Sequence, residues 1–246
     1  QLREQVAGRL EQVLRTDSAE LRERESALKE LREQIAKSSK KEVIDRVAYI
    51  WFNRFCALRF MDVNRYTRLG IVSPAEGLSQ PEVLQEAKQG YIDDDLKRFV
   101  EPQRVFDLLN GQRPSADPQG EAYRLLLVAA CNFYGEVMPF MFEKIADYTE
   151  LLMPLDLLSE HAVLHGLREA LTPEACQDVE VIGWLYQYYI AERKDEVFEA
   201  LKQNQKIEAG DIPAATQLFT PHWIVRYLVE NSLGRLWMLN RPGSRL

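Results

Sequence analysis

Residues 43–63, VIDRVAYIWFNRFCALRFMDV, decide the fold class of this 246-residue chain. Apolar residues recur in this stretch at intervals of three and four: Val43, Val47, Ile50, Trp51, Phe55 and Leu58. The period predicts an α-helix, and its apolar side chains cover more than half of the circumference. Ser39 and Glu42 have the spacing of a capping box, which marks a helix start. We therefore expect a central helix in which Trp51, Phe55 and Leu58 are buried together.

The same periodicity continues along the rest of the chain. Residues 121–154 predict two more apolar helices, which Gly135 and Pro139 bend or separate. A further helix is expected from about Asp178, and it carries aromatic residues into a charged tract. No segment alternates apolar and polar residues over a useful strand length, and no internal repeat occurs. The predicted fold class is mainly α, with many helices.

Three regions follow from these patterns. Residues 1–38 predict an N-terminal helical arm, residues 39–205 a helical domain, and residues 206–246 a linker followed by a last helix. A capping-box spacing at Asp17 and Glu20 precedes an apolar stripe in the arm. The stripe consists of Leu21, Leu28, Leu31 and Ile35. It fits a helix on the protein surface or, as an alternative, a coiled-coil contact.

The composition is that of an ordinary soluble globular protein, with 46% hydrophobic and 28% charged residues. No apolar run approaches the roughly 18 residues of a membrane span, so no membrane contact is expected. The cysteines are scattered and form no CxxC motif: Cys56, Cys131 and Cys176. This usage favours a reducing, cytoplasmic location.

The net charge of −7 is unevenly distributed. Residues 111–210 contain 8 Lys and Arg against 17 Asp and Glu, whereas residues 211–246 contain 4 against 2. An acidic surface of this kind repels phosphate. We therefore expect broad contact with DNA to come from sequence outside these residues.

Two groups of residues have part, but not all, of the ligand pattern of a metal site. His161 and His165 have the spacing of two ligands on one helix face, yet no third ligand lies in an obvious place. Asp178, Glu192 and Lys194 imitate the D…ExK site of restriction nucleases, which needs a strand to aim its side chains, whereas this tract predicts a helix. We therefore expect two helix-surface histidines, no metal and no nuclease.

The stretch from Trp51 to Arg59 combines aromatic and basic side chains and allows two interpretations. In the first, the aromatics stack on nucleic-acid bases while Arg54 and Arg59 contact phosphates. In the second, the aromatics belong to the core and the arginines reach from it to solvent. We favour the second interpretation.

Residues 216–237, TQLFTPHWIVRYLVENSLGRLW, contain the most informative motif. Thr220 and Pro221 predict a helix start, at which the hydroxyl caps the first turn and the proline takes the first helical position. A helical packing face follows: Val225, Leu228, Val229, Ser232 and Leu233. The free N–H groups of such a start are a natural seat for a carboxylate.

This stretch resembles the Phe/Tyr-Thr-Pro motif, motif X, of many adenine-specific DNA methyltransferases. The resemblance implies that Phe219, Thr220 and Pro221 contact the methionine part of the cofactor S-adenosylmethionine. It also implies that residues 206–246 lead into the start of a methyltransferase domain.

A wider match covers roughly residues 43–237. Four strings, in this order, are similar to the N-terminal region of PglX-like adenine-specific methyltransferases of BREX-type phage-defence systems: residues 48–63, 123–143, 179–198 and 211–237. The resemblance implies a parent enzyme that methylates the exocyclic amine of adenine in double-stranded DNA, with other phage-defence subunits as possible partners. An alternative is a helical interaction module that docks such subunits. A second alternative, an N-terminal nuclease, lacks the strand-borne D…ExK.

The sequence motifs that methyl transfer requires are absent from this chain. A methyltransferase of this class needs a Gly-rich turn to approach the cofactor, yet the twelve glycines form no GxG. It also needs an Asp/Asn-Pro-Pro-aromatic loop for the flipped base, yet no Pro-Pro occurs. We expect no catalytic residue within the chain, a catalytic α/β core outside it, and no activity from the chain alone.

Overall fold

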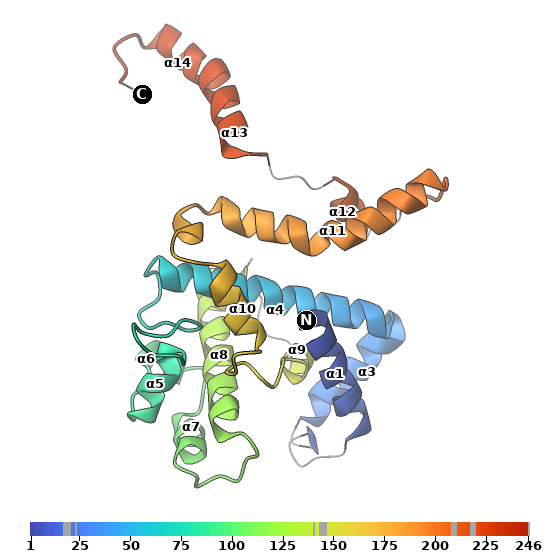
Figure 1. Cartoon of the computed structure of the whole chain (residues 1–246), viewed down its shortest axis with the longest axis vertical. Coiled ribbons are helices and arrows are strands. Elements are labelled where there is room, and N and C mark those ends of the chain that lie inside the picture. Colours follow the sequence, from blue (N-terminus) through green and yellow to red (C-terminus); the bar gives the residue numbers. More distant parts are fainter. Residues whose placement is uncertain are drawn as a thin grey trace. The chain divides into compact units, whose positions relative to one another are not determined.

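The computed structural model describes residues 1–16, 21–22, 24–139, 141–142, 147–207, 211–216 and 220–245 (Figure 1). The chain forms two compact units, Gln1–Gln177 and Asp178–Leu246. Within the described residues every regular element is a helix, and the sole β-type pairing is an isolated bridge between Pro74 and Pro81. The prediction of a mainly α fold is confirmed.

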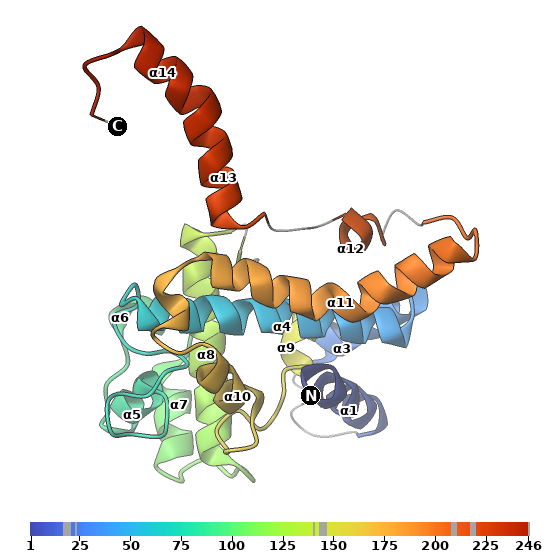
Figure 2. The ribbon, with the colours of Figure 1, turned by 45° about the horizontal axis from the view of Figure 1, so that its top comes forward.

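The first unit contains nine α-helices and a short 3₁₀ turn within its described residues. They are α1 (Leu2–Arg15), α3 (Glu25–Lys37), α4 (Lys40–Val63), α5 (Glu82–Lys88), α6 (Asp94–Lys97), α7 (Pro102–Leu109), α8 (Pro118–Val137), α9 (Asp147–Leu151), α10 (Val163–Ala170) and η1 (Ala175–Gln177). Figures 1 and 2 show α4 running across this unit, with α8 crossing it and α1 and α3 beside its N-terminal end.

Helix α4 is the centre of the first unit, as its sequence predicts. The Ser39 side chain accepts a hydrogen bond from the N–H of Glu42 at 3.2 Å, so the predicted helix start is confirmed. Trp51, Phe55 and Leu58 are at most 1% exposed. The indole N–H of Trp51 donates to the carbonyl of Thr149 at 3.0 Å, which satisfies its buried polar atom.

The first two helices pack inside this unit. Helix α1 buries Val6, Leu10 and Val13 and lies against α4, while α3 lies against α9. In the apolar stripe, Leu21 and Leu31 are buried, whereas Leu28 and Ile35 are partly exposed. The capping residues expected at positions 17 and 20 lie outside the described residues. The division of the chain at residues 38 and 205 stays a prediction.

The loop of residues 71–73, which follows α4, is fixed by hydrogen bonds to a single carboxylate. Asp62 accepts hydrogen bonds from the N–H groups of Ile71, Val72 and Ser73 at 3.0, 2.9 and 3.0 Å. The hydroxyl of Thr67 donates to the same carboxylate at 2.8 Å. These bonds pair backbone donors that belong to no helix, so the loop packs without leaving buried N–H groups unsatisfied.

Helix α8 crosses α4 and ends where the sequence predicts a break. Its N-cap is Asp117, whose carboxylate accepts a hydrogen bond from the N–H of Gly120 at 3.0 Å. It ends at Val137, two residues before Pro139, and the next helix, α9, begins at Asp147. The expected pair of helices is therefore present, with the second only five residues long.

The second unit contains α11 (Glu180–Lys202), α12 (Ile212–Thr216), α13 (His222–Val229), the π-helical turn η3 (Glu230–Gly234) and α14 (Arg235–Asn240) within its described residues. Helices α11 and α12 pack on each other, and Arg193 of α11 donates to the Asp211 carboxylate at 2.7 Å. The helix expected from about Asp178 is confirmed. In the described part of the chain, no helix has the length and apolar character needed to cross a bilayer.

Candidate functional site

The candidate site is the start of α13, where the motif Phe219-Thr220-Pro221 meets the helix. Phe219 lies outside the described residues. Pro221 is the N-cap, with φ −51° and ψ 138°, and the first helical residue is His222. The N–H groups of Ile224 and Val225 donate to the carbonyl of Pro221 at 2.9 and 3.3 Å, so the helical ladder begins there.

The predicted capping by Thr220 is wrong by one residue. The extended ψ of Pro221 delays helical backbone until His222, so Pro221 itself is the cap and Thr220 precedes it. No side-chain hydrogen bond caps this end. The Thr220 hydroxyl is therefore placed beside the helix start without a capping role.

The helix start retains the electrostatic character expected of it. The N–H groups of His222 and Trp223 precede the first intrahelical donors and have no acceptor inside the helix. Together with the helix dipole they form a partly positive end that favours a carboxylate or phosphate. Both Thr220 and Pro221 are exposed, so a ligand has access to this end. The residues present therefore fit the carboxylate of an amino-acid-like ligand.

Helices α13, η3 and α14 form one continuous run from His222 to Asn240. In its middle, the side chains of Asn231 and Ser232 donate to the carbonyls of Tyr227 and Leu228 at 2.8 and 2.6 Å. Such bonds to the preceding turn accompany the wider π-helical turn at this point.

This helical run is apolar on its surface and has no buried residue between positions 220 and 245. Its exposed large hydrophobic residues are Trp223, Val225, Tyr227, Leu228, Val229, Leu233, Leu236, Trp237, Met238 and Leu239. The expected packing face is thus present as a helix, and no other helix of the second unit covers it. A contiguous apolar surface of this kind marks an interaction site.

The other sequence-predicted candidates do not assemble into a site. His161 precedes α10, whereas His165 lies in it and faces Glu169 at 3.5 Å, so the two histidines do not share a helix. No group of three potential ligands lies together among the residues that the structure describes. Glu192 and Lys194 lie within α11, as expected. The D…ExK site of restriction nucleases requires a strand at this position, whereas the structure has a helix there.

The aromatic and basic stretch of α4 belongs to the core. Trp51 is fully buried, which prevents it from stacking on a base. Arg54 lies over its ring, with the guanidinium carbon 5.2 Å from the ring centroid. Arg59 donates to the carbonyl of Leu171 at 3.0 Å and to the hydroxyl of Ser73 at 2.7 Å. The buried positions of Trp51 and Phe55 confirm the aromatics as core residues. The expectation that the arginines reach solvent is wrong for Arg54, which is only 3% exposed because its guanidinium packs over the Trp51 ring.

Comparison with known proteins covers most of the chain. It is 39% identical over 221 residues to adenine-specific methyltransferase BrxX of Escherichia coli O9:H4 (strain HS). It is also 39% identical over 210 residues to adenine-specific methyltransferase PglX of Lacticaseibacillus casei (strain Zhang). The resemblance to PglX-like adenine-specific methyltransferases is confirmed. These alignments cover 87% and 80% of the chain. No protein-family model matches the chain.

The chain spans only a small part of these PglX-like relatives, 17% of the first and 16% of the second. The similarity therefore relates the helical architecture to one region of a much longer methyltransferase. The activity of the longer proteins enters here as a proposal only.

Proposed function

We propose that this chain is the N-terminal region of a DNA methyltransferase that acts in defence against phage. The longer enzyme transfers the methyl group of S-adenosylmethionine to the exocyclic amine of adenine in double-stranded DNA, in the cytoplasm. The observation that carries this proposal is the 39% identity, over most of the chain, to two proteins named adenine-specific methyltransferases. The chain alone is inactive, because the Gly-rich turn and the base-holding loop are absent from its sequence.

Within that enzyme, Phe219, Thr220 and Pro221 form one wall of the cofactor pocket. The exposed N–H groups of His222 and Trp223 hold the carboxylate of the cofactor's methionine part. The hydroxyl of Thr220 donates a further hydrogen bond to it. The support is the uncapped helix start, where two N–H groups have no intrahelical acceptor and Thr220 directly precedes the N-cap Pro221.

The apolar run 222–240 then packs against the catalytic core of the longer protein. Ten large hydrophobic side chains of this run are exposed in the present chain. Covering such a surface stabilises a protein by about 25 cal/mol for each Å² removed from water. The run thereby connects the helical units to the domain that performs the chemistry.

Two substitutions of Thr220 in the longer enzyme test the cofactor contact. Thr220→Gly removes the hydroxyl, and we expect S-adenosylmethionine to bind about tenfold more weakly in calorimetry. Thr220→Ser keeps a hydroxyl and should bind normally. Because Thr220 makes no capping bond, both variants should melt close to the unsubstituted enzyme. Normal affinity in the glycine variant would exclude Thr220 from the cofactor site.

A second function, docking of other defence subunits, is favoured by one observation. Helix α11 exposes Trp184 at 50% and Tyr188 at 82%. Large aromatic residues are enriched at protein interfaces. If docking is the chief role, the isolated chain should capture purified defence subunits, and Trp184→Ala with Tyr188→Ala should abolish the capture. This role is compatible with methyl transfer by the longer protein.

A further inference from the structure

In the first unit, a pocket of about 310 Å³ lies between the chain that follows α4, helix α6 and the end of α8. Three aromatic side chains line this aromatic pocket, Tyr66 after α4 and both Phe133 and Tyr134 of α8. The carboxylates of Asp93 and Asp95, at the start of α6, also line it, and most of the remaining lining is aliphatic. The volume equals that of about ten water molecules, so the pocket has room for one long side chain.

The turn that ends α4 fixes Tyr66 in this pocket. The N–H of Tyr66 donates to the carbonyl of Met61 at 2.8 Å, and the N–H of Arg65 donates to the carbonyl of Asp62 at 3.1 Å. These two bonds form a Schellman motif, and Arg65 takes its left-handed position, with φ 58°. The ring of Tyr66 packs edge-on against that of Phe60, with the centroids 6.4 Å apart. Tyr66 is therefore held in one place, although it is 67% exposed.

The two carboxylates of the aromatic pocket share one loosely held cation. An Nη of Arg68, whose side chain is exposed, lies 3.5 Å from Asp93 and 3.8 Å from Asp95. Both distances exceed the length of a charge-assisted hydrogen bond, about 2.7–2.9 Å. Among the described residues, no other ion pair reaches either carboxylate. With one guanidinium for two carboxylates, the lining keeps an excess of one negative charge.

Burial strengthens the effect of this negative charge. Asp93 is buried, and one of its oxygens accepts a hydrogen bond from the N–H of Asp95 at 2.9 Å, while the other faces Arg68. Burial raises the pKa of the Tyr134 phenol to about 12, and nearby carboxylates, Asp93 and Asp95 among them, contribute to the same shift. An aromatic ring of the lining is thus in a negative potential, which favours a cation and disfavours an anion.

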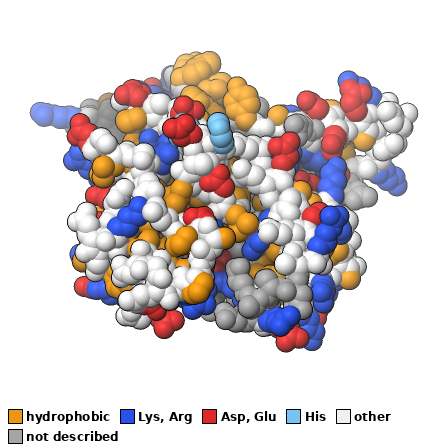
Figure 3. All heavy atoms as spheres, turned by 60° about the horizontal axis from the view of Figure 1, so that its bottom comes forward, with side chains coloured by type: hydrophobic (Ala, Val, Ile, Leu, Met, Phe, Trp, Pro, Cys, Tyr) orange, Lys and Arg blue, Asp and Glu red, His pale blue; other side chains and the backbone are white. Residues whose placement is uncertain are grey.

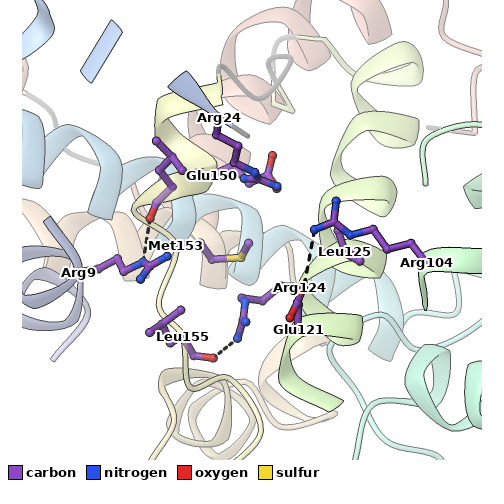
Figure 4. Close-up of a pocket in the computed structure, with 10 residues that line it drawn as sticks. Arg9, Arg24, Arg104, Glu121, Arg124, Leu125, Glu150, Met153 and Leu155 are labelled. Atoms are coloured by element: carbon purple, nitrogen blue, oxygen red, sulfur yellow. Dashed lines mark hydrogen bonds and ion pairs between the residues drawn. The ribbon is translucent and has the colours of Figure 1, made fainter. Parts of the chain in front are cut away.

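Charges are balanced more closely in two other places that the figures show. Figure 3 shows one face of the molecule, on which acidic and basic side chains are interspersed. In the pocket drawn in Figure 4, Arg24 pairs with Glu150 at 2.6 Å. In the same pocket, Arg104 pairs with Glu121 at 3.5 Å. Each carboxylate there has its own arginine, and the cavity of about 30 Å³ holds about one water molecule. The aromatic pocket differs in both charge and size.

We propose that the aromatic pocket binds an arginine side chain of a partner protein. A guanidinium is flat and always charged, so it can stack on aromatic rings and donate parallel hydrogen bonds to carboxylates. The aliphatic stem of an arginine suits the aliphatic part of the lining. The chain's own Arg68 shows that a guanidinium approaches these carboxylates, although from an exposed side chain and at distances too long for strong bonds. Binding here does not depend on the proposed methyl transfer.

An NMR titration of the 246-residue chain tests the site, with a capped Ala-Arg-Ala peptide as the probe. The amide signals of α6 and of the end of α8 should shift as the peptide binds. The same peptide with citrulline in place of arginine keeps the shape and loses the charge, so we expect it to bind about tenfold more weakly or less. Equal binding of the two peptides would exclude a site for a cation. Tighter binding of spermidine than of the arginine peptide would assign the pocket to a free polyamine and not to a partner protein.

Two substitutions in the lining should weaken the binding of the arginine peptide. Asp95→Asn should weaken it about fivefold, as expected for the loss of one partly exposed ion pair. Tyr66→Leu should weaken it about threefold, because it removes a ring and keeps an apolar side chain. Asp94→Asn is the matched control for Asp95→Asn. It removes the same charge from the next residue, which pairs with Lys97 at 2.6 Å outside the pocket, and should change affinity less than about twofold.

Arg68→Gln should have the opposite effect. It removes the guanidinium that competes for both carboxylates, so we expect severalfold tighter binding, which a purely structural role of these residues does not produce. Because the side chain of Arg68 is exposed, this variant should fold normally, and it decides the matter if Asp95→Asn melts early in circular dichroism. Equal effects of Asp95→Asn and Asp94→Asn, or weaker binding by Arg68→Gln, would mean that no arginine site exists here.

Discussion

Burial raises the pKa of the Cys56 and Cys131 thiols to about 12. The pKa of Cys176 is also raised, chiefly by burial, and all three side chains are at most 1% exposed. At pH 8 only about one in ten thousand thiols with a pKa of 12 is a reactive thiolate. We therefore predict that Ellman's reagent labels none of the three cysteines in the folded chain at pH 8. The same chain in urea should release three equivalents, and rapid labelling without urea would contradict the buried positions.

The carboxylate of Asp62 accepts backbone hydrogen bonds from three successive residues of the loop after α4. Asp62→Asn replaces one acceptor oxygen by an N–H₂ group that faces backbone donors, so at least one N–H group among residues 71–73 loses its partner. We expect the free energy of unfolding to fall by about 3 kcal/mol. Urea denaturation measures this loss. Asp94→Asn, at an 83% exposed carboxylate, should leave the midpoint unchanged. Equal midpoints for the two variants would mean that the loop does not depend on Asp62.

At the residue scale, the sequence predicted the cap at Ser39 correctly, predicted a cap at Thr220 wrongly, and gave no sign of the hydrogen bonds that Asp62 accepts. Ser39 and Glu42 form the expected cap because their spacing alone decides it. Thr220 does not cap, because the dihedral angles of the following proline, which no pattern reveals, shift the helix start by one residue. The bonds of Asp62 cross nine to eleven residues without any periodicity, so they left no signal in the sequence.

At the scale of one helix, the same substitution should have opposite effects in α1 and α8. Gly8 is exposed in the middle of α1, and a methyl group added there meets nothing within 4 Å. Gly8→Ala should therefore raise the free energy of unfolding by about 1 kcal/mol through helix propensity. A methyl group at Gly135 would lie 2.6 Å from the carbonyl oxygen of Phe142, and this clash outweighs the propensity gain. Thermal melts should show Gly8→Ala above and Gly135→Ala below the unsubstituted chain. A gain in both would mean that the chain after α8 moves aside freely.

The helices themselves were predictable where a long apolar period exists. Helices α4, α8 and α11 contain most of the strong pattern, and all three lie where the sequence places them. The short helices α5, α6 and α7 were not predicted, because four to eight residues do not establish a period. The pocket drawn in Figure 4 was also not predicted, because its lining comes from residues between Arg9 and Leu155, which only the packing of the first unit brings together.

At the scale of the whole molecule, the chain combines a closed first unit with an uncovered apolar helix. The first unit has a buried core of large side chains, in which Trp51, Tyr123, Phe55 and Phe142 are under 2% exposed. The run 222–240 buries none. A helix of this length without tertiary packing is only marginally stable in water. The difference is the physical reason to expect that the longer protein supplies the missing surface.

Hydrogen exchange tests this expectation for the run 222–240. In the 246-residue chain we predict that the amides of residues 224–240 exchange within seconds, because no side chain of the run is buried. In the longer protein, burial against the catalytic core should slow their exchange by at least about a hundredfold. The amides of α4 are the internal control, since their helix is buried in the first unit and should be protected equally in both proteins. Fast exchange of residues 224–240 in the longer protein would mean that no core covers them. The run would then be a docking surface for another subunit, and the proposed wall of the cofactor pocket would lose its support.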